Sequence, residues 1–225
     1  MNKKFELIWF KFLSFKGLKD NQSTTLVELM ICLVIIATIV LSLFSLETFS
    51  HSQVISADRR SKVQNTLAYC LEHMSKYVEQ AGGNNNIGYP AIALYPAAGA
   101  KTGFQVRVDF NNPRTPAIPS DDAVVYYSLN SSLHTITTAC SGTCGSFISE
   151  VLTRKIVGGF NNSVPASISA NPTMATDGFF VVVDPLGNYV DIGLIGRYDP
   201  EEATSTINPQ IGMKTRLICN NSSTN

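Results

Sequence analysis

An uncharged apolar run from Leu29 to Leu46 constrains this chain more than any other feature of the sequence. The run is 18 residues long, which is close to the ~20 residues with which a helix spans a bilayer. A single carboxylate, Glu28, precedes it directly. A charge inside a membrane-length helix costs a few kcal/mol and usually marks a function. The sequence therefore predicts one transmembrane helix with a functional acidic residue near its start.

Thr25 and Glu28 have a second interpretation. Their spacing fits a capping box, in which a Thr hydroxyl and a Glu carboxylate bind the free N–H groups at the start of a helix. An ordinary signal anchor can carry such a cap. In that case Glu28 has no role beyond the beginning of the helix.

The segment before the run is basic. Five lysines, Lys3, Lys4, Lys11, Lys16 and Lys19, stand against Glu6 and Asp20, so the positive-inside rule keeps this leader in the cytoplasm and exports the remainder. A secretory signal peptide places an apolar region of about 7–15 residues before its cleavage site. Because the run here is longer, we expect it to be retained.

The residues Thr25–Ile31, between a Lys-bearing leader and an apolar helix, resemble the processing site of type IV prepilins and type II secretion pseudopilins. The resemblance places the cleavage between Ser23 and Thr24, where the family usually has Gly and Phe. It implies that a prepilin peptidase cuts there and methylates the new amine of Thr24. It also implies that Glu28 pairs with the Thr24 amine of a neighbouring subunit during assembly.

The helix is expected to continue far beyond the membrane, since no glycine lies between Gly17 and Gly82 and the first proline is Pro90. Its second half carries an apolar stripe that needs a partner sheet. The members of that stripe are Val63, Leu67, Cys70, Leu71, Met74, Val78 and Ala81. The expected regions are a leader (1–23), a transmembrane half (24–50), an amphipathic half (51–82) and a β-rich head (83–225).

Alternating apolar residues follow the helix and predict strands. The segments are Ala91–Tyr95, Phe104–Phe110, Ala123–Leu129, Leu133–Ala139, Phe147–Thr153, Phe179–Asp184, Tyr189–Arg197 and Met213–Cys219. Residues 220–225 are expected to form a frayed tail. The predicted class is α+β, with a long N-terminal helix packed on a mostly antiparallel sheet, as in pilins.

Three later segments resemble parts of W-type minor pilins and J-type pseudopilins. They are Ala68–Gly82, Val190–Arg197 and Met213–Asn220. The resemblance implies a minor type IV pilin that is inserted in the bacterial inner membrane and later joins a fibre. The alternatives are a minor pseudopilin of a type II secretion system and, in a different class, a signal-anchored extracytoplasmic binding or sensing domain. The implied partners are the prepilin peptidase, other pilin or pseudopilin subunits, an inner-membrane assembly platform and membrane lipid.

Four of the five cysteines lie in the exported part. Cys140 and Cys144 are separated by Ser, Gly and Thr, and they are expected to form a disulfide in an oxidising compartment. Cys70 and Cys219 have two open interpretations, a bridge from the helix to the last strand or two buried free thiols, because sequence does not fix connectivity.

Other chemistry has little support in the sequence. The three histidines lie in no nucleophilic or zinc motif, and no phosphate-binding loop follows a strand. The formal net charge is zero and the basic residues are scattered, apart from Asp58–Lys62, which argues against nucleic acid. That cluster is expected to face lipid headgroups or another subunit. We expect no enzyme activity, cofactor or metal.

Overall fold

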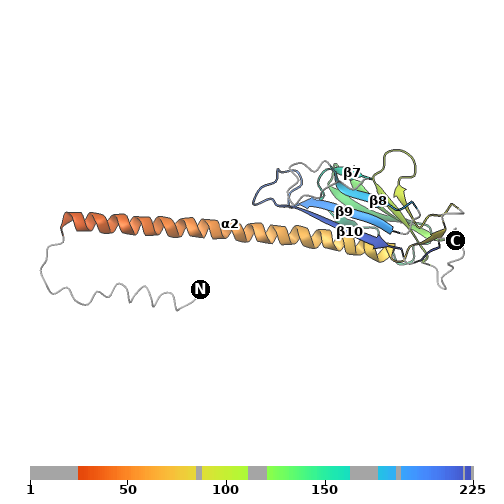
Figure 1. Cartoon of the computed structure of the whole chain (residues 1–225), viewed down its shortest axis with the longest axis horizontal. Helices are drawn as coiled ribbons and strands as arrows, with labels where there is room; N and C mark the ends of the chain where they lie inside the picture. Colours follow the sequence, from red (N-terminus) through yellow and green to blue (C-terminus); the bar gives the residue numbers. More distant parts are fainter. Residues whose placement is uncertain are drawn as a thin grey trace. The chain divides into compact units, whose positions relative to one another are not determined.

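The computed structural model describes residues 25–84, 88–110, 121–162, 177–185, 189–219 and 221–223. The chain divides into two compact units, the first ending at His51 and the second beginning at Ser52. Helix α2 (Leu26–Val78) runs through this division without a break, and the strands follow it (Figure 1). The class is α+β, as predicted from the sequence.

The second half of α2 supplies one wall of the core in the second unit. All seven members of the predicted stripe are buried, and Tyr77 joins them. The helix ends at Val78, four residues before the predicted end at residue 82, and Ala81 forms a β-bridge with Val108 instead. The stripe therefore continues into the first residues after the helix.

A five-stranded antiparallel sheet forms the first half of the head, in the order β2-β3-β4-β5-β6. Its inner side chains alternate with outer ones, most regularly along β4. The inner ones pack in the same core as the stripe of α2. Its strands are β2 (Ile92–Tyr95), β3 (Gly103–Val108), β4 (Ala123–Asn130), β5 (Thr135–Ser141) and β6 (Val151–Thr153).

A four-stranded sheet in the order β10-β9-β8-β7 lies beside α2 (Figure 1). Its strands are β7 (Gly159–Asn161), β8 (Asp177–Val183), β9 (Tyr189–Arg197) and β10 (Gln210–Ile218). Two glycines of β9 allow close packing. Gly193 is paired with Phe180, whose ring occupies the place of a Cβ, and an added Cβ on Gly196 would lie 3.0 Å from Leu67 of α2.

Three features of the head differ from the sequence prediction. The strands form two main sheets where one was expected. The tail is not frayed at residues 221–223, because β11 (Asn221–Ser223) pairs in parallel with β1 (Gly82–Asn84). The strand predicted over Phe147–Thr153 begins only at Val151. The N–H of Phe147 donates to the Cys144 carbonyl in a turn at 2.9 Å, and its ring contacts that of Tyr77.

Candidate functional site

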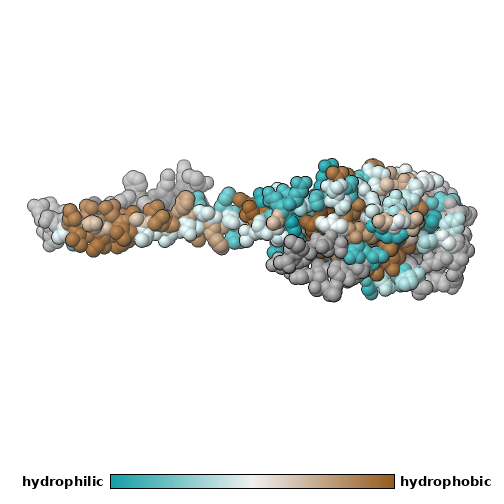
Figure 2. All heavy atoms as spheres, turned by 90° about the horizontal axis from the view of Figure 1, so that it is seen from above, coloured by the Kyte–Doolittle hydropathy of each residue, from teal (hydrophilic) through white to brown (hydrophobic). Residues whose placement is uncertain are grey.

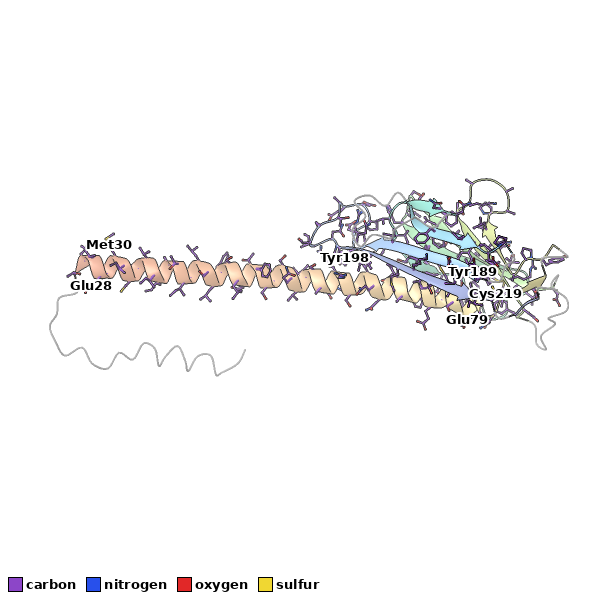
Figure 3. All side chains as sticks on the ribbon, viewed as in Figure 1. Glu28, Met30, Glu79, Tyr189, Tyr198 and Cys219 are labelled. Atoms are coloured by element: carbon purple, nitrogen blue, oxygen red, sulfur yellow. A yellow bond between two sulfur atoms is a disulfide. The ribbon has the colours of Figure 1, made fainter. Side chains whose placement is uncertain are left out.

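The beginning of α2 holds Glu28, and it forms the predicted capping box. The Glu28 carboxylate accepts hydrogen bonds from the Thr25 backbone N–H at 2.9 Å and from the Thr25 hydroxyl at 3.1 Å. In return, the N–H of Glu28 donates to the Thr25 hydroxyl at 3.4 Å. Figure 3 shows Glu28 at this end of the helix. Both acceptor contacts use the same oxygen, Oε2, so within the part of the chain that the structure describes Oε1 is available to another donor.

The predicted processing residues, Ser23 and Thr24, lie outside the described residues. The cleavage site and the methylated amine therefore remain predictions from the sequence.

The first half of α2 exposes apolar side chains on every side. The large apolar residues from Leu26 to Phe49 are between 52% and 76% exposed, and they form the brown stretch of the helix in Figure 2. The helix is long and apolar enough to cross a membrane.

Three hydroxyl groups of this half, those of Thr38, Ser42 and Thr48, are bound within the helix itself. Thr38 donates to the carbonyl of Ile35 at 2.8 Å, and Ser42 donates to that of Thr38 at 2.8 Å. A hydroxyl bound in this way does not need water or a partner chain. These side chains therefore add little to the cost of placing the helix in an apolar environment.

Some residues of the basic cluster Asp58–Lys62 make contacts within the protein itself. Lys62 pairs with Asp58 at 2.8 Å, an exposed helical pair of the i,i+4 type. Arg59 instead donates to the backbone carbonyl of Ile207 at 2.6 Å and lies 4.6 Å from the centre of the Tyr198 ring. It therefore ties the helix to the segment after β9, a role that the sequence did not predict.

The cysteines fall into a bonded pair and free thiols. Cys140 and Cys144 are joined by a disulfide, with their Cα atoms 6.1 Å apart. Cys70 and Cys219 are buried free thiols, so of the two interpretations the structure shows the thiols and not the bridge. Burial raises the pKa of Cys70 to about 12 and that of Cys219 to about 11.

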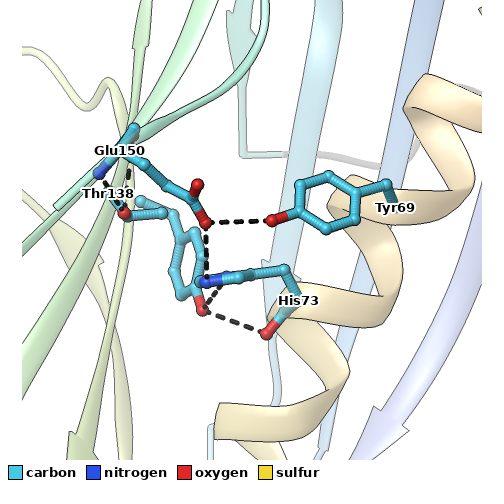
Figure 4. Close-up of polar contacts among 5 residues, drawn as sticks. Tyr69, His73, Thr138 and Glu150 are labelled. Atoms are coloured by element: carbon cyan, nitrogen blue, oxygen red, sulfur yellow. Dashed lines mark hydrogen bonds and ion pairs between the residues drawn. The ribbon is translucent and has the colours of Figure 1, made fainter. Parts of the chain in front are cut away.

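A polar cluster at the junction of α2 and the five-stranded sheet was not predicted from the sequence. His73 Nδ1 lies 3.2 Å from the Tyr127 hydroxyl, and its Nε2 lies 3.5 Å from Glu150 Oε1 (Figure 4). The Tyr69 hydroxyl donates to the same Glu150 oxygen at 3.0 Å. Thr138 holds Glu150 in place through its N–H and hydroxyl.

The chemistry of this cluster centres on protonation of His73. Burial lowers the pKa of His73, and nearby Glu150 opposes that effect. Burial also raises the pKa of Tyr127 well above its ordinary value, so the hydroxyl keeps its proton and can donate to the His73 carbonyl at 3.3 Å. The rings of Tyr77 and Phe147 pack against the imidazole. In the sequence, the only sign of this polar cluster is the i,i+4 spacing of Tyr69, His73 and Tyr77.

No group of three or more His, Cys, Asp or Glu side chains in the described part of the chain is arranged to hold a metal ion.

Comparison with known proteins gives no match to a protein family, a curated protein or a solved structure. The structure by itself defines the class. It is an α+β protein whose described part contains one helix able to span a membrane, and the second half of that helix packs on a mostly antiparallel head.

We expect the exported protein to show two kinds of cysteine. Under native, non-reducing conditions iodoacetamide should label neither Cys140 nor Cys144, because they are bonded. It should also spare Cys70 and Cys219, whose thiols are buried and protonated. Among the four cysteines of the exported part, peptide mass mapping after mild reduction should then find label on Cys140 and Cys144 alone, while denaturation exposes Cys70 and Cys219. Native labelling of Cys140 and Cys144 without reductant would contradict the bond.

We expect the head to lose stability as the pH falls through the range of His73. The folded state lowers the pKa of His73, so its contribution is fully present above the ordinary histidine pKa of about 6.5 and is lost as the pH falls toward the folded value. Urea midpoints of the full chain in detergent, followed by near-ultraviolet circular dichroism from pH 5 to 8, should fall at the acid end. His73→Gln should flatten that slope and the exposed His51→Gln should not. Parallel curves for wild type and His73→Gln would refute the assignment.

Proposed function

We propose that this chain is a minor type IV prepilin. It is inserted in the inner membrane with its leader in the cytoplasm and its head outside. A prepilin peptidase cleaves it between Ser23 and Thr24 and methylates Thr24. An assembly platform then brings it together with other pilin subunits in a fibre. Its role is structural, and we propose no catalytic activity.

The observation that carries this proposal is the exposed apolar half of α2 with one carboxylate at its start. Burial of apolar surface is worth roughly 25 cal/mol per Å², so a helix that is apolar on every side needs an apolar environment along its whole length. Membrane lipid provides it before assembly. The same half-helices of neighbouring subunits provide it in a fibre.

Glu28 fits both stages. In the precursor, the carboxylate is occupied by Thr25 through hydrogen bonds whose net worth is ~1 kcal/mol each. Cleavage would create a charged amine at Thr24. An ionic group left unpaired in an apolar bundle costs about 3–5 kcal/mol, which exceeds the worth of the cap. The free Oε1 of Glu28 can take the amine of a neighbour while Oε2 keeps the cap.

Two other functions remain as alternatives. A minor pseudopilin of a type II secretion system would use the same helix and the same processing. A signal-anchored binding or sensing domain is favoured by one specific observation, the complete capping box between Thr25 and Glu28, because a cap alone accounts for the carboxylate in such a protein.

We expect co-expression with an active prepilin peptidase to shorten the chain by its first 23 residues and leave Thr24 methylated. Intact-mass measurement and N-terminal sequencing check this outcome. Ser23→Gly should speed the cut, because the resemblance places glycine at that position. An inactive peptidase is the control, and a chain that stays uncut beside the active enzyme would remove the main support for the proposal.

We expect Glu28→Gln and Glu28→Ala to leave membrane insertion intact but to impair incorporation into the fibre. Insertion depends on the apolar run, and removal of a charge favours it, whereas assembly loses the partner of the Thr24 amine. The measured quantity is processed subunit in purified filaments relative to the membrane. Glu47→Gln, at the far end of the apolar run, is the matched control. Equal incorporation of the Glu28 variants and wild type would favour the anchored-domain alternative.

A further inference from the structure

A hollow of about 560 Å³ lies on the five-stranded sheet, within the size range of small-ligand sites. Six of its lining residues carry hydroxyl or amide groups, one is aromatic, one is cationic and three are aliphatic. They are Thr102, Ser128, Asn130, Ser131, Thr135 and Thr137, with Tyr95, Arg154, Leu129, Leu133 and Val151.

The floor of the hollow belongs to the face of the sheet that points away from the core. Along β4 the core residues are Val125, Tyr127 and Leu129, so Ser128 points to the opposite face. Ser128 is paired with Gly103 on one side and with Thr137 on the other. Gly103 is buried and also pairs with Tyr95 of β2. An added Cβ on Gly103 would lie 1.7 Å from the carbonyl oxygen of Tyr127, so glycine allows the close approach of β3 and β4 beside the hollow.

Hydrogen bonds in the neighbouring turns fix the residues that form the walls of the hollow. The Asn130 side chain accepts the N–H of Leu133 at 3.2 Å and thereby places the 64% exposed Leu133 at the rim. Thr102 is fixed on both sides, since its N–H donates to Tyr95 at 2.9 Å and its carbonyl accepts from Leu129 at 2.8 Å. Hydrogen bonds within the head therefore hold these wall residues in place, which lowers the entropy cost of binding.

Arg154 gives the hollow its charge. It follows β6 directly and is exposed, and within the described part of the chain its guanidinium makes no hydrogen bond or ion pair. A guanidinium binds a carboxylate through two parallel hydrogen bonds. The other polar groups are hydroxyls and an amide, which donate and accept at once. Donors and acceptors in pairs suit a ligand that bears several hydroxyl groups.

We propose that this hollow, the Arg154 hollow, binds an acidic saccharide. Arg154 takes the carboxylate, and Tyr95 with Leu133 covers the apolar face of a ring. The floor hydroxyls of Ser128 and Thr137, which lie 3.1 Å apart and bind each other, accept from sugar hydroxyls through their remaining lone pairs. This inference goes beyond the proposed function and does not rest on it, because an anchored domain would carry the same hollow.

Isothermal titration of the full chain in detergent micelles tests the proposal with two probes. One is a hyaluronan tetrasaccharide, which carries glucuronate carboxylates, and the other is the same tetrasaccharide with its carboxylates reduced to alcohols. The acidic probe should bind saturably and more tightly than the reduced one. Arg154→Gln should weaken the acidic probe about tenfold or more, as expected for loss of a charged hydrogen bond, and should leave the reduced probe unchanged.

Two further variants distinguish binding in the hollow from nonspecific attraction to positive charge and from loss of the fold. Thr137→Val keeps a β-branched residue in β5 and should weaken both probes, with an unchanged near-ultraviolet spectrum. Arg60→Gln removes an exposed arginine of α2 and should change neither. The proposal is wrong if neither probe binds saturably, if both bind equally, or if Arg60→Gln weakens the acidic probe as much as Arg154→Gln.

Discussion

The apolar first half of α2 is the constraint on which the rest of the structure depends. Among the described residues, none covers its side chains. Three of its hydroxyls are nevertheless bound to backbone carbonyls of the helix itself, and no glycine or proline interrupts it. Such a helix is stable in hydrocarbon, where every backbone group must be satisfied within the helix, and costly in water. The second half of the same helix is suited to water instead, because its apolar residues form a narrow stripe that two sheets bury.

Much of this division could be predicted from the sequence because it depends on local patterns. The stripe from Val63 to Ala81 has helical spacing, and strand β9 has the predicted bounds, Tyr189–Arg197. The cap between Thr25 and Glu28 is also local, since its members are three residues apart. In each case the side-chain pattern and the nearest neighbours along the chain suffice to decide the structure.

The features that were missed depend on partners far away in the chain. β11 pairs with β1 across more than a hundred residues, and neither segment has a strand pattern of its own, so only the backbone partner makes them strands. The hydrogen bond of Arg59 to Ile207 has the same cause. The His73 cluster needs Tyr127 and Glu150 from two other parts of the sheet, and the Arg154 hollow needs residues from four strands and their turns. Sequence periodicity shows which face of an element is polar, but not which faces meet.

The carboxylates of Glu28 and Glu150 follow one rule. A charged group that loses contact with water needs hydrogen-bond donors from the protein in its place. Glu150 is half exposed and has its donors within the head, the Tyr69 hydroxyl and the imidazole of His73, so its environment is complete in one subunit. Among the described residues, Glu28 has donors only on Thr25, and both of these contacts use one oxygen. A carboxylate with one unused oxygen at the start of an apolar helix is adequately solvated at a membrane surface, where water can supply the missing donor. Once water is excluded by packing of helices, a further donor must come from another chain. Under the proposed function, the Glu28 carboxylate forms the capping box first and the intersubunit pair later. The cap does not have to be lost for the pair to form, because the two use different oxygens.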